Sequence, residues 1–171
     1  MAPARCRTGC HGWRYHSVAV ACFIEGGGAG PKETARLDLE ADGTVWVYVG
    51  STAVGQGLET VMAQIAADTL GLPLGQVRVL HGSTPFLEEG YGAFASRSTV
   101  LGGSAVFEAA RALLAKIRAA AGARLGFAAE QVELVDGSAC APDGRSLAFA
   151  ELAADGLRVT TAFGNDNRLR R

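Results

Sequence analysis

The sequence predicts an α+β fold in which a mixed β-sheet packs against two long helices. Three observations predict it: an alternating strand pair around an Asp-Gly turn, two stretches with apolar residues at helical spacing, and a globular composition. The chain has 171 residues, of which 49% are hydrophobic and 19% are charged, so it is long enough for one domain with a sizeable core. Its 23 glycines are an excess that indicates many tight turns or backbone brought close to a ligand.

The first 16 residues differ from the rest, since they are basic, lack a hydrophobic period and contain two cysteines. We expect residues 1–16 to be an atypical, disordered N-terminal segment. Cys6, Cys10, His11 and His16 could be read as zinc ligands. Ligands packed so densely rarely converge on one tetrahedral ion, so the sequence favours the interpretation without zinc.

Residues 18–24 form a continuous apolar run that is rich in strand-forming residues. Such a run predicts a buried strand, with Cys22 as a core residue. The glycine-rich stretch 26–31 then interrupts the chain. It lacks the spacing of a phosphate loop and is typical of a flexible turn.

A β-hairpin is predicted for the next segment. Ala35, Leu37 and Leu39 alternate with polar residues, as in a half-buried strand. Asp42-Gly43 is a hairpin turn signal, and the run 44–49 returns as the partner strand.

A helix is predicted after this hairpin, followed by a short strand. Apolar residues recur at near-helical spacing from Leu58 to Leu70, and Gly71 and Pro73 are stop signals. Residues 76–80 then predict a short strand.

The second half of the chain holds a long irregular segment, a second long helix and a mixed C-terminal part. Residues 81–98 carry scattered glycines, and an unstructured loop of this length is often functional. The helix is predicted from near Thr99 to an end around Gly122 to Gly126, with one apolar face: Val106, Ala109, Leu113 and Ile117. Beyond it we expect two short strands and a brief helix: 132–134, 157–161 and 149–154. Residues 164–171 are expected to be a solvated basic tail.

Two glycine-rich turns are candidate binding sites, and the first spans residues 50–57. It joins a predicted strand to a helix, where free backbone N–H groups and the helix dipole favour an anion. Gly55 and Gly57 nearly reproduce the dinucleotide fingerprint, but Thr60 replaces its third glycine, which disfavours a Rossmann site. From spacing alone, anion binding and a plain tight turn with Gln56 facing solvent are equally good interpretations.

The second candidate is the stretch 90–99, which leads into the second helix. Ser96, Ser98 and Thr99 could each cap that helix, whereas three hydroxyls beside Arg97 would suit a phosphate. Two glycines follow in the first turn and weaken the helix, which indicates that something approaches the backbone closely. Capping and phosphate binding both stay open.

Several function classes have little support. The formal net charge is −1, and no basic stripe with interleaved aromatics occurs, which disfavours nucleic-acid binding. No apolar run is long enough to cross a membrane, and the N-terminus lacks the apolar region of a signal peptide, so we expect a cytoplasmic protein. No serine-hydrolase pattern occurs, and Glu88-Glu89 fits a solvated loop tip better than acid–base chemistry.

The two candidate turns, with their surroundings, resemble one family. The run GSTAVGQGLETVMAQIAADTLGLPLGQVRVLHGST at 50–84 and the run GAFASRSTVLGGSAVFEAA at 92–110 are similar to the large subunit of molybdenum hydroxylases. These include xanthine dehydrogenase, aldehyde oxidase and aerobic carbon monoxide dehydrogenase. The run GPKETAR at 30–36 and the hairpin after it also fit. The resemblance covers roughly residues 18–125 and implies that residues 17–163 are part of the second molybdopterin-binding domain of that subunit.

The resemblance implies a molybdopterin-type molybdenum cofactor, often the cytosine dinucleotide form in bacteria. In the family, the glutamine of the GQG turn approaches the molybdenum centre and the pterin, a role that passes to Gln56 between Gly55 and Gly57. The ASRST segment lines the pterin and phosphate, which carries over to five residues: Ala95, Ser96, Arg97, Ser98 and Thr99. The metal is held through the pterin, so no direct metal ligand is assigned in this chain.

The implied reaction hydroxylates a heterocycle or aldehyde, or oxidises a small molecule, with oxygen from water and electrons passing to iron–sulfur and FAD partners. The family's general base is a glutamate in a G-x-G-E context that this chain lacks. Glu25, Glu88 and Glu89 stand in other surroundings, so no catalytic residue is assigned, and Ser83 stands where the family commonly carries aspartate.

We therefore expect one piece of a longer large subunit, which is not active alone. Its expected partners are the remaining parts of that subunit, iron–sulfur and flavin subunits, and a small-molecule substrate. The alternatives are a non-catalytic truncated remnant and a generic phosphate- or nucleotide-binding module.

Overall fold

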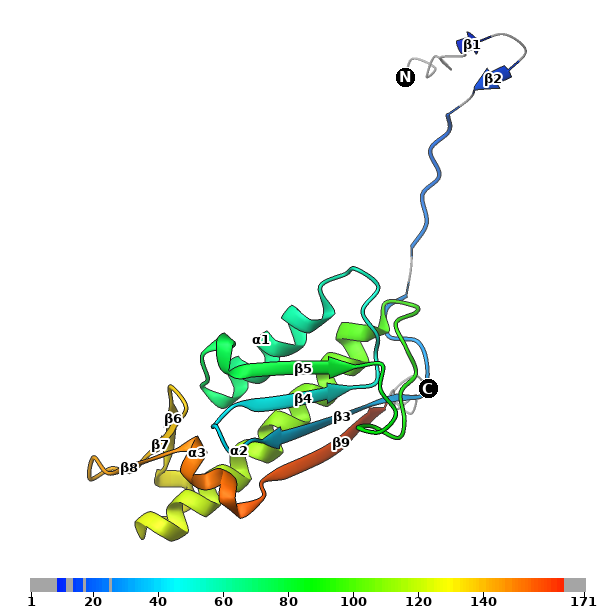
Figure 1. Ribbon diagram of the computed structural model, residues 1–171. Coiled ribbons are helices and arrows are strands. Elements are labelled where there is room, and N and C mark those ends of the chain that lie inside the picture. The colour runs from blue at the N-terminus through cyan, green and yellow to red at the C-terminus, as the bar shows by residue number, and fades with distance from the viewer. Residues whose placement is uncertain (1–8, 12–13, 17, 25, 165–171) are drawn as a thin grey trace.

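The centre of the molecule is a four-stranded mixed sheet (Figure 1). The computed structural model describes residues 9–11, 14–16, 18–24 and 26–164. The strands follow in space the order β5 (Val77–His81), β4 (Val45–Val49), β3 (Lys32–Leu39) and β9 (Arg158–Gly164). β3 is antiparallel to both of its neighbours, whereas β4 and β5 are parallel. The α+β prediction with a mixed sheet is confirmed.

The predicted hairpin is the pair β3 and β4. Leu37 lies opposite Val47 in the register, and both side chains are fully buried. The turn is closed by the Asp42 carboxylate, which accepts hydrogen bonds from the Thr44 backbone N–H (2.9 Å) and hydroxyl (2.6 Å). These two bonds also lower the pKa of Asp42. The Asp-Gly turn between alternating strands thus correctly predicted the hairpin.

The first long helix, α1 (Leu58–Leu70), connects β4 to β5. Parallel neighbouring strands need such a crossover. The helix ends at Gly71, whose left-handed backbone (φ 65°) lets its N–H bond the carbonyl of Ala67. The predicted stop signal is therefore the actual end of the helix.

The second long helix, α2 (Ser104–Leu125), packs against β3, β9 and α1. Figure 1 shows both helices on the same face of the sheet. The predicted apolar face of α2 is fully buried: Val106, Ala109, Leu113 and Ile117. A π-helical segment, η2 (Ser98–Gly103), leads directly into α2.

The C-terminal part adds a small three-stranded antiparallel sheet and completes the large sheet. The small sheet consists of β6 (Glu133–Val135), β7 (Ser138–Cys140) and β8 (Ser146–Ala148). Its connection to β9 is α3 (Phe149–Leu152) with a 3-10 turn, η4 (Ala153–Asp155). Two further 3-10 turns are η1 (Leu74–Gln76) and η3 (Ala129–Gln131). Strand β6 matches the predicted strand at 132–134, whereas β7 and β8 were not predicted.

The N-terminal region corrects one expectation. In the described part of residues 1–16 the structure has a short antiparallel pair, β1 (Gly9–His11) and β2 (Arg14–His16). The buried strand predicted for 18–24 is wrong: this segment is not a strand, and every residue of it is exposed, including Cys22. A continuous apolar run shows that a segment favours burial, but burial also needs a covering layer, which the described residues do not provide for 18–24.

Other expectations fall outside the described residues. Of the expected tail 164–171, only Gly164 is described, and it ends β9. The side chains proposed for zinc cannot be placed either, since Cys6 and those of the β1–β2 pair lie outside the described part. No helix in the described part of the chain is long and apolar enough to cross a membrane.

Candidate functional site

The two candidate turns lie at the same end of the sheet. Because β4 and β5 are parallel, the loops 50–57 and 82–97 both leave from their carboxyl ends. Helices α1 and η2 begin at this end and contact each other. Figure 1 shows the loops and both helix starts gathered there. Two segments that are far apart in the sequence are thus brought together by the parallel pairing.

The first turn, Gly55–Gly57, is exposed and is closed by its own glutamine. The Gln56 Oε1 atom accepts a hydrogen bond from the Val54 N–H at 2.6 Å, and its Nε2 atom donates to the Thr52 carbonyl at 3.3 Å. The flanking glycines have φ values of 97° and 74°, a region that side chains with a Cβ rarely adopt. The GQG sequence therefore specifies the shape of this turn.

The start of α1 offers backbone donors to an anion. Its capping residue, Gly57, has no side chain that could occupy the first N–H groups of the helix. Glu59 lies in the first turn, and its Oε1 atom is 2.8 Å from the Nε2 atom of His81. This hydrogen bond lowers the pKa of Glu59. The acidic residue nearest the turn is thus engaged by a partner on β5.

The second turn contains two consecutive non-glycine residues in the left-handed region. Ala95 has a φ of 48° and Ser96 a φ of 50°. Such backbone costs of order 1–3 kcal/mol per residue and occurs mostly where the surroundings impose it, often at functional sites. One such constraint is the Gly28 N–H, which donates to the Ala95 carbonyl at 3.1 Å. After this turn, Thr99 is exposed and Ser98 is half-buried.

Arg97 differs from its hydroxyl-bearing neighbours because it is completely buried. Its Nη1 atom lies 3.2 Å from the Glu33 carboxylate, whose side chain is also completely buried. Its Nη2 atom donates to the Lys32 carbonyl, and its Cζ atom lies 5.3 Å and 5.2 Å from the ring centroids of Tyr91 and Phe94. The guanidinium is therefore bound to the protein itself and anchors the second turn to β3.

Glu33 connects this anchor to the first loop. Its Oε2 atom accepts a hydrogen bond from the Ser51 hydroxyl at 3.2 Å, and its Oε1 atom accepts one from the Tyr91 N–H at 3.4 Å. Neither Glu33 nor Ser51 was singled out in the sequence. A signal existed, since the alternation that turns Ala35, Leu37 and Leu39 inward also turns Glu33 inward. A carboxylate at a core position requires a buried partner.

The close approach expected at the two glycines of the second helix is real, and the approaching groups belong to the chain. A Cβ on Gly102 would lie 3.2 Å from the Ser51 Oγ atom, and one on Gly103 would lie 3.0 Å from the Ile65 Cδ1 atom. The glycines therefore let η2 pack onto the first loop and onto α1.

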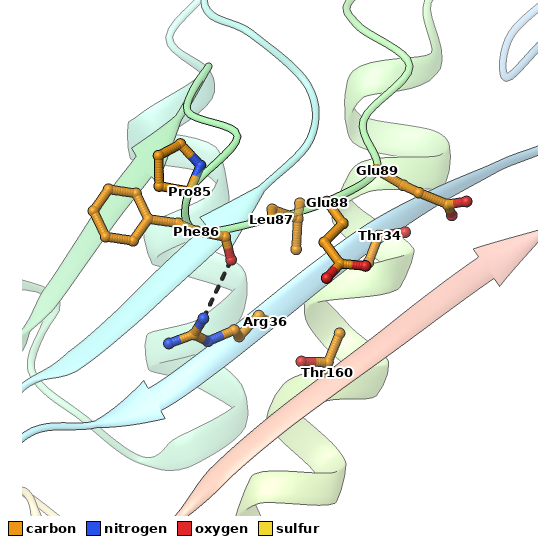
Figure 2. Close-up of a pocket in the computed structure, with 8 residues that line it drawn as sticks. All are labelled: Thr34, Arg36, Pro85, Phe86, Leu87, Glu88, Glu89 and Thr160. Carbon is orange, nitrogen blue, oxygen red and sulfur yellow. Dashed lines mark hydrogen bonds between the residues drawn. The ribbon is translucent and has the colours of Figure 1, made fainter.

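A pocket of about 320 Å³ lies on the sheet face opposite the helices (Figure 2). It is lined by Thr34, Arg36, Thr160 and the loop residues Pro85, Phe86, Leu87, Glu88 and Glu89. Arg36 donates to the Phe86 carbonyl at 3.3 Å. Its guanidinium also binds the buried carboxylate of Asp38 through two atoms, which raises the pKa of Arg36. Because its charge is already paired, this pocket offers little to a polyanion.

A second hollow of about 290 Å³ lies beside the first and involves the same loop. Its lining includes Gly50, Gly82 and Gly90. Both Glu88 and Glu89 are exposed, and Glu89 pairs with the Lys32 ammonium at 2.5 Å, which raises the pKa of Lys32. Within the stretches that the structure describes, no group of three His, Cys, Asp or Glu side chains could hold a metal ion.

The geometry of the two turns fits an anionic, polar ligand better than either pocket does. Each turn has left-handed backbone next to a helix start, and neither helix start has a capping side-chain hydrogen bond. Exposed hydroxyls stand beside the second turn, at Ser96 and Thr99. Among the eight predicted contact residues, Arg97 has a side chain that is completely buried and paired with a carboxylate of the protein.

Comparison with known proteins places nearly the whole chain in one family. Residues 2–168 match the family described as "Molybdopterin cofactor-binding domain". The 6-hydroxypseudooxynicotine dehydrogenase complex subunit gamma of Paenarthrobacter nicotinovorans is 36% identical over 121 residues, 71% of this chain and 15% of the relative. The putative xanthine dehydrogenase molybdenum-binding subunit of Escherichia coli K12 is 38% identical over 128 residues, 70% of this chain and 17% of the relative.

Solved structures agree with these sequence matches. Quinoline 2-oxidoreductase from Pseudomonas putida 86 superposes with a TM-score of 0.70 at 30% identity, over 81% of this chain and 20% of the other. A Cu,Mo-CO dehydrogenase in its carbon monoxide reduced state gives a TM-score of 0.72 at 27% identity, over 82% and 21%. The chain thus spans 15% to 21% of the length of these relatives.

Proposed function

The chain belongs to the family of molybdopterin cofactor-binding domains found in molybdenum hydroxylases, and from this membership we propose that its two turns hold the cofactor from two sides. One observation carries the proposal: Gly55–Gly57 and Ala95–Thr99 lie at the same end of the sheet, each beside a helix start. Backbone N–H groups and helix dipoles stabilise phosphate oxygens at such positions. The cytosine dinucleotide form of the cofactor is part of the proposal.

Gln56 is proposed to contact the molybdenum centre and the pterin. Its amide already makes one hydrogen bond through each end, to Val54 and Thr52. An amide nitrogen has two N–H groups and its oxygen has two lone pairs, so each end keeps one position for a ligand. The hydrogen bonds inside the turn thus orient the Gln56 side chain and leave one N–H group and one oxygen lone pair for a ligand.

The hydroxyls of Ser96, Ser98 and Thr99 are proposed to donate to the pterin and phosphate. Arg97 serves the site differently, because its charge is paired with Glu33 in the interior. We propose that Arg97 holds the backbone of the second turn in place and that its neighbours make the contacts. The link from Glu33 to Ser51 then fixes the first loop relative to the second.

The bound cofactor would supply the redox chemistry, in which an oxygen atom from water is added to a small molecule and two electrons and two protons are released. This chain is proposed to bind and orient the cofactor. No residue is assigned as the base: Glu88 is exposed, Glu89 is paired with Lys32, and Glu25 lies outside the described residues. We propose that the base, the iron–sulfur centres and FAD belong to other parts of a cytoplasmic complex.

Metal content tests the proposal. The chain is co-expressed with the Escherichia coli molybdenum-binding subunit from which the matching segment has been deleted, and molybdenum per chain is measured by mass spectrometry. Removing three contacts in the variant Gln56→Ala, Ser96→Ala, Ser98→Ala should lower the molybdenum content strongly. Ser146→Ala, at an exposed serine of β8, is the matched control and should retain it. Stoichiometric molybdenum in the triple variant would refute the assignment of the site.

A further inference from the structure

The N-terminal arm, Val18–Ile24, is apolar at every position and exposed along its whole length. Its large side chains are almost completely accessible, with 90% exposure for Val20, 83% for Phe23 and 100% for Ile24. Figure 1 shows the arm extending away from the sheet and helices. Scattered exposed apolar residues are ordinary in proteins, but a contiguous set of this kind marks an interaction site.

The composition of the arm is that of a strand buried on both faces. Successive residues of an extended strand point to opposite sides. Val18, Val20 and Ile24 would then share one side, and Ala19, Ala21 and Phe23 the other. Both sides are apolar, with β-branched residues on the first and an aromatic residue on the second, as in strands that are covered by other layers on both faces.

The glycine stretch that follows the arm packs on the second turn of the proposed site through Gly28. Gly28 is buried, and a Cβ on it would lie 2.7 Å from the Val100 Cγ1 atom. Its N–H also donates to the Ala95 carbonyl. Nearby, Phe94 and Val100 keep 53% and 47% of their surface exposed. Exposed apolar side chains therefore also stand on the segment proposed to hold the cofactor, at the place where the chain leads out to the arm.

A second copy of this chain could cover only part of the arm. In the described part of the chain, the long helices cover one face of the sheet and leave the other face without a helix (Figure 1). A strand added beside β5 or β9 would therefore leave one of its apolar faces open. In the relatives, the rest of a much longer chain could cover both faces of the arm. The family match includes the arm, since it spans residues 2–168, and in those proteins the shared part is 15% to 21% of the chain.

We infer that the arm inserts as a β-strand between layers of the remaining part of a molybdenum hydroxylase large subunit, whether that part is joined to this chain or separate. The inference rests on the proposed function for the identity of the partner. Main-chain hydrogen bonds to a neighbouring strand would hold the arm, and pockets on both faces would take its side chains. Gly28, which follows the arm, donates to the Ala95 carbonyl. Insertion of the arm would therefore bring the partner next to the second turn.

Capture by a defined probe tests the inference. The probe is the Escherichia coli subunit without its matching segment, and the full chain is co-expressed with it as wild type, as the variant Val20→Lys, Phe23→Lys, or as Val135→Lys. The last replaces a valine of β6 that is 50% exposed and serves as the matched control. Thermal unfolding of each isolated chain verifies folding, and hydrogen exchange reports on the backbone of the arm.

We expect the wild type and the control to be captured and the arm variant to bind at least about 10-fold more weakly. Arm amides should exchange about 100-fold more slowly in the complex than in the isolated chain. Failure of the wild type to bind, equal capture of the arm variant, or an unprotected arm in the complex would overturn the inference. A dimer of the isolated chain that requires the arm would overturn it in favour of a second copy.

Molybdenum analysis of the same samples separates this inference from the proposed function. A complex that protects the arm but holds no molybdenum would refute the cofactor proposal and leave the inference standing. Molybdenum bound by a complex in which the arm stays unprotected would do the opposite.

Discussion

Replacing Arg97 with methionine should destabilise the domain strongly, because it leaves a buried carboxylate without its counter-charge. The Arg97 and Glu33 side chains are both fully buried, with nitrogen and oxygen 3.2 Å apart. Removing one partner of such a pair costs about 3–5 kcal/mol. Glu33 would keep hydrogen bonds from Ser51, Thr34 and Tyr91, which favours the lower end, about 3 kcal/mol.

Urea and thermal unfolding of the isolated chain measure this cost. In a domain of this size each kcal/mol lowers Tm by about 2–4 °C, so Arg97→Met should lower it by about 6–12 °C. Arg111→Met is the matched control, since this arginine is 63% exposed and 4.0 Å from Glu108, and should change stability by less than about 0.5 kcal/mol. Adding Glu33→Gln to Arg97→Met should cost less than the sum of the single changes. A loss below about 1 kcal/mol for Arg97→Met, or strictly additive effects, would refute the buried-pair argument.

Two other predictions concern the same end of the molecule. Gly50→Ala should lower the free energy of unfolding in urea by roughly 1–3 kcal/mol, because its Cβ would lie 2.5 Å from the Gly90 Cα atom. Gly75→Ala is the control, since its Cβ would have nothing within 4 Å, and it should change the stability little. Equal effects of the two changes would contradict the packing. His81→Ala should raise the pKa of Glu59, measured by NMR, since the hydrogen bond from His81 lowers it. A carboxylate whose folded-state pKa lies below its unfolded value stabilises the fold at neutral pH, and this stabilisation is lost as the pH falls through the folded-state value. The stability difference between wild type and His81→Ala should therefore shrink in acid. An unchanged Glu59 pKa in the variant would contradict the assignment.

Local patterns predicted the elements that hold the site. The hairpin around Asp42-Gly43 and the buried face of α2 follow from periodicities that need no knowledge of the rest of the chain. The two glycine-rich turns were also visible from their composition, and the left-handed backbone at Gly55 and Gly57 explains the glycines of the first turn. The resemblance to the molybdenum hydroxylases then indicated the ligand that we propose for these turns.

The features that the sequence did not reveal depend on which residues meet in space. An arginine among hydroxyls suits a phosphate, and only the fold shows that Arg97 is buried against Glu33. The arm at 18–24 has the composition of a buried strand, yet burial depends on a covering layer that the described residues do not provide. Both differences point to the same physical limit, because a pattern gives a preference and tertiary packing decides whether it is met.

The most direct test of the central claim is a crystal structure of the captured, molybdenum-loaded complex, with anomalous diffraction measured at the molybdenum edge. Our account predicts cofactor density bounded by Gly55–Gly57 on one side and by Ala95–Thr99 on the other, with the Arg97 side chain still paired with Glu33. Cofactor density in the pocket beside Arg36, or away from both turns, would contradict it.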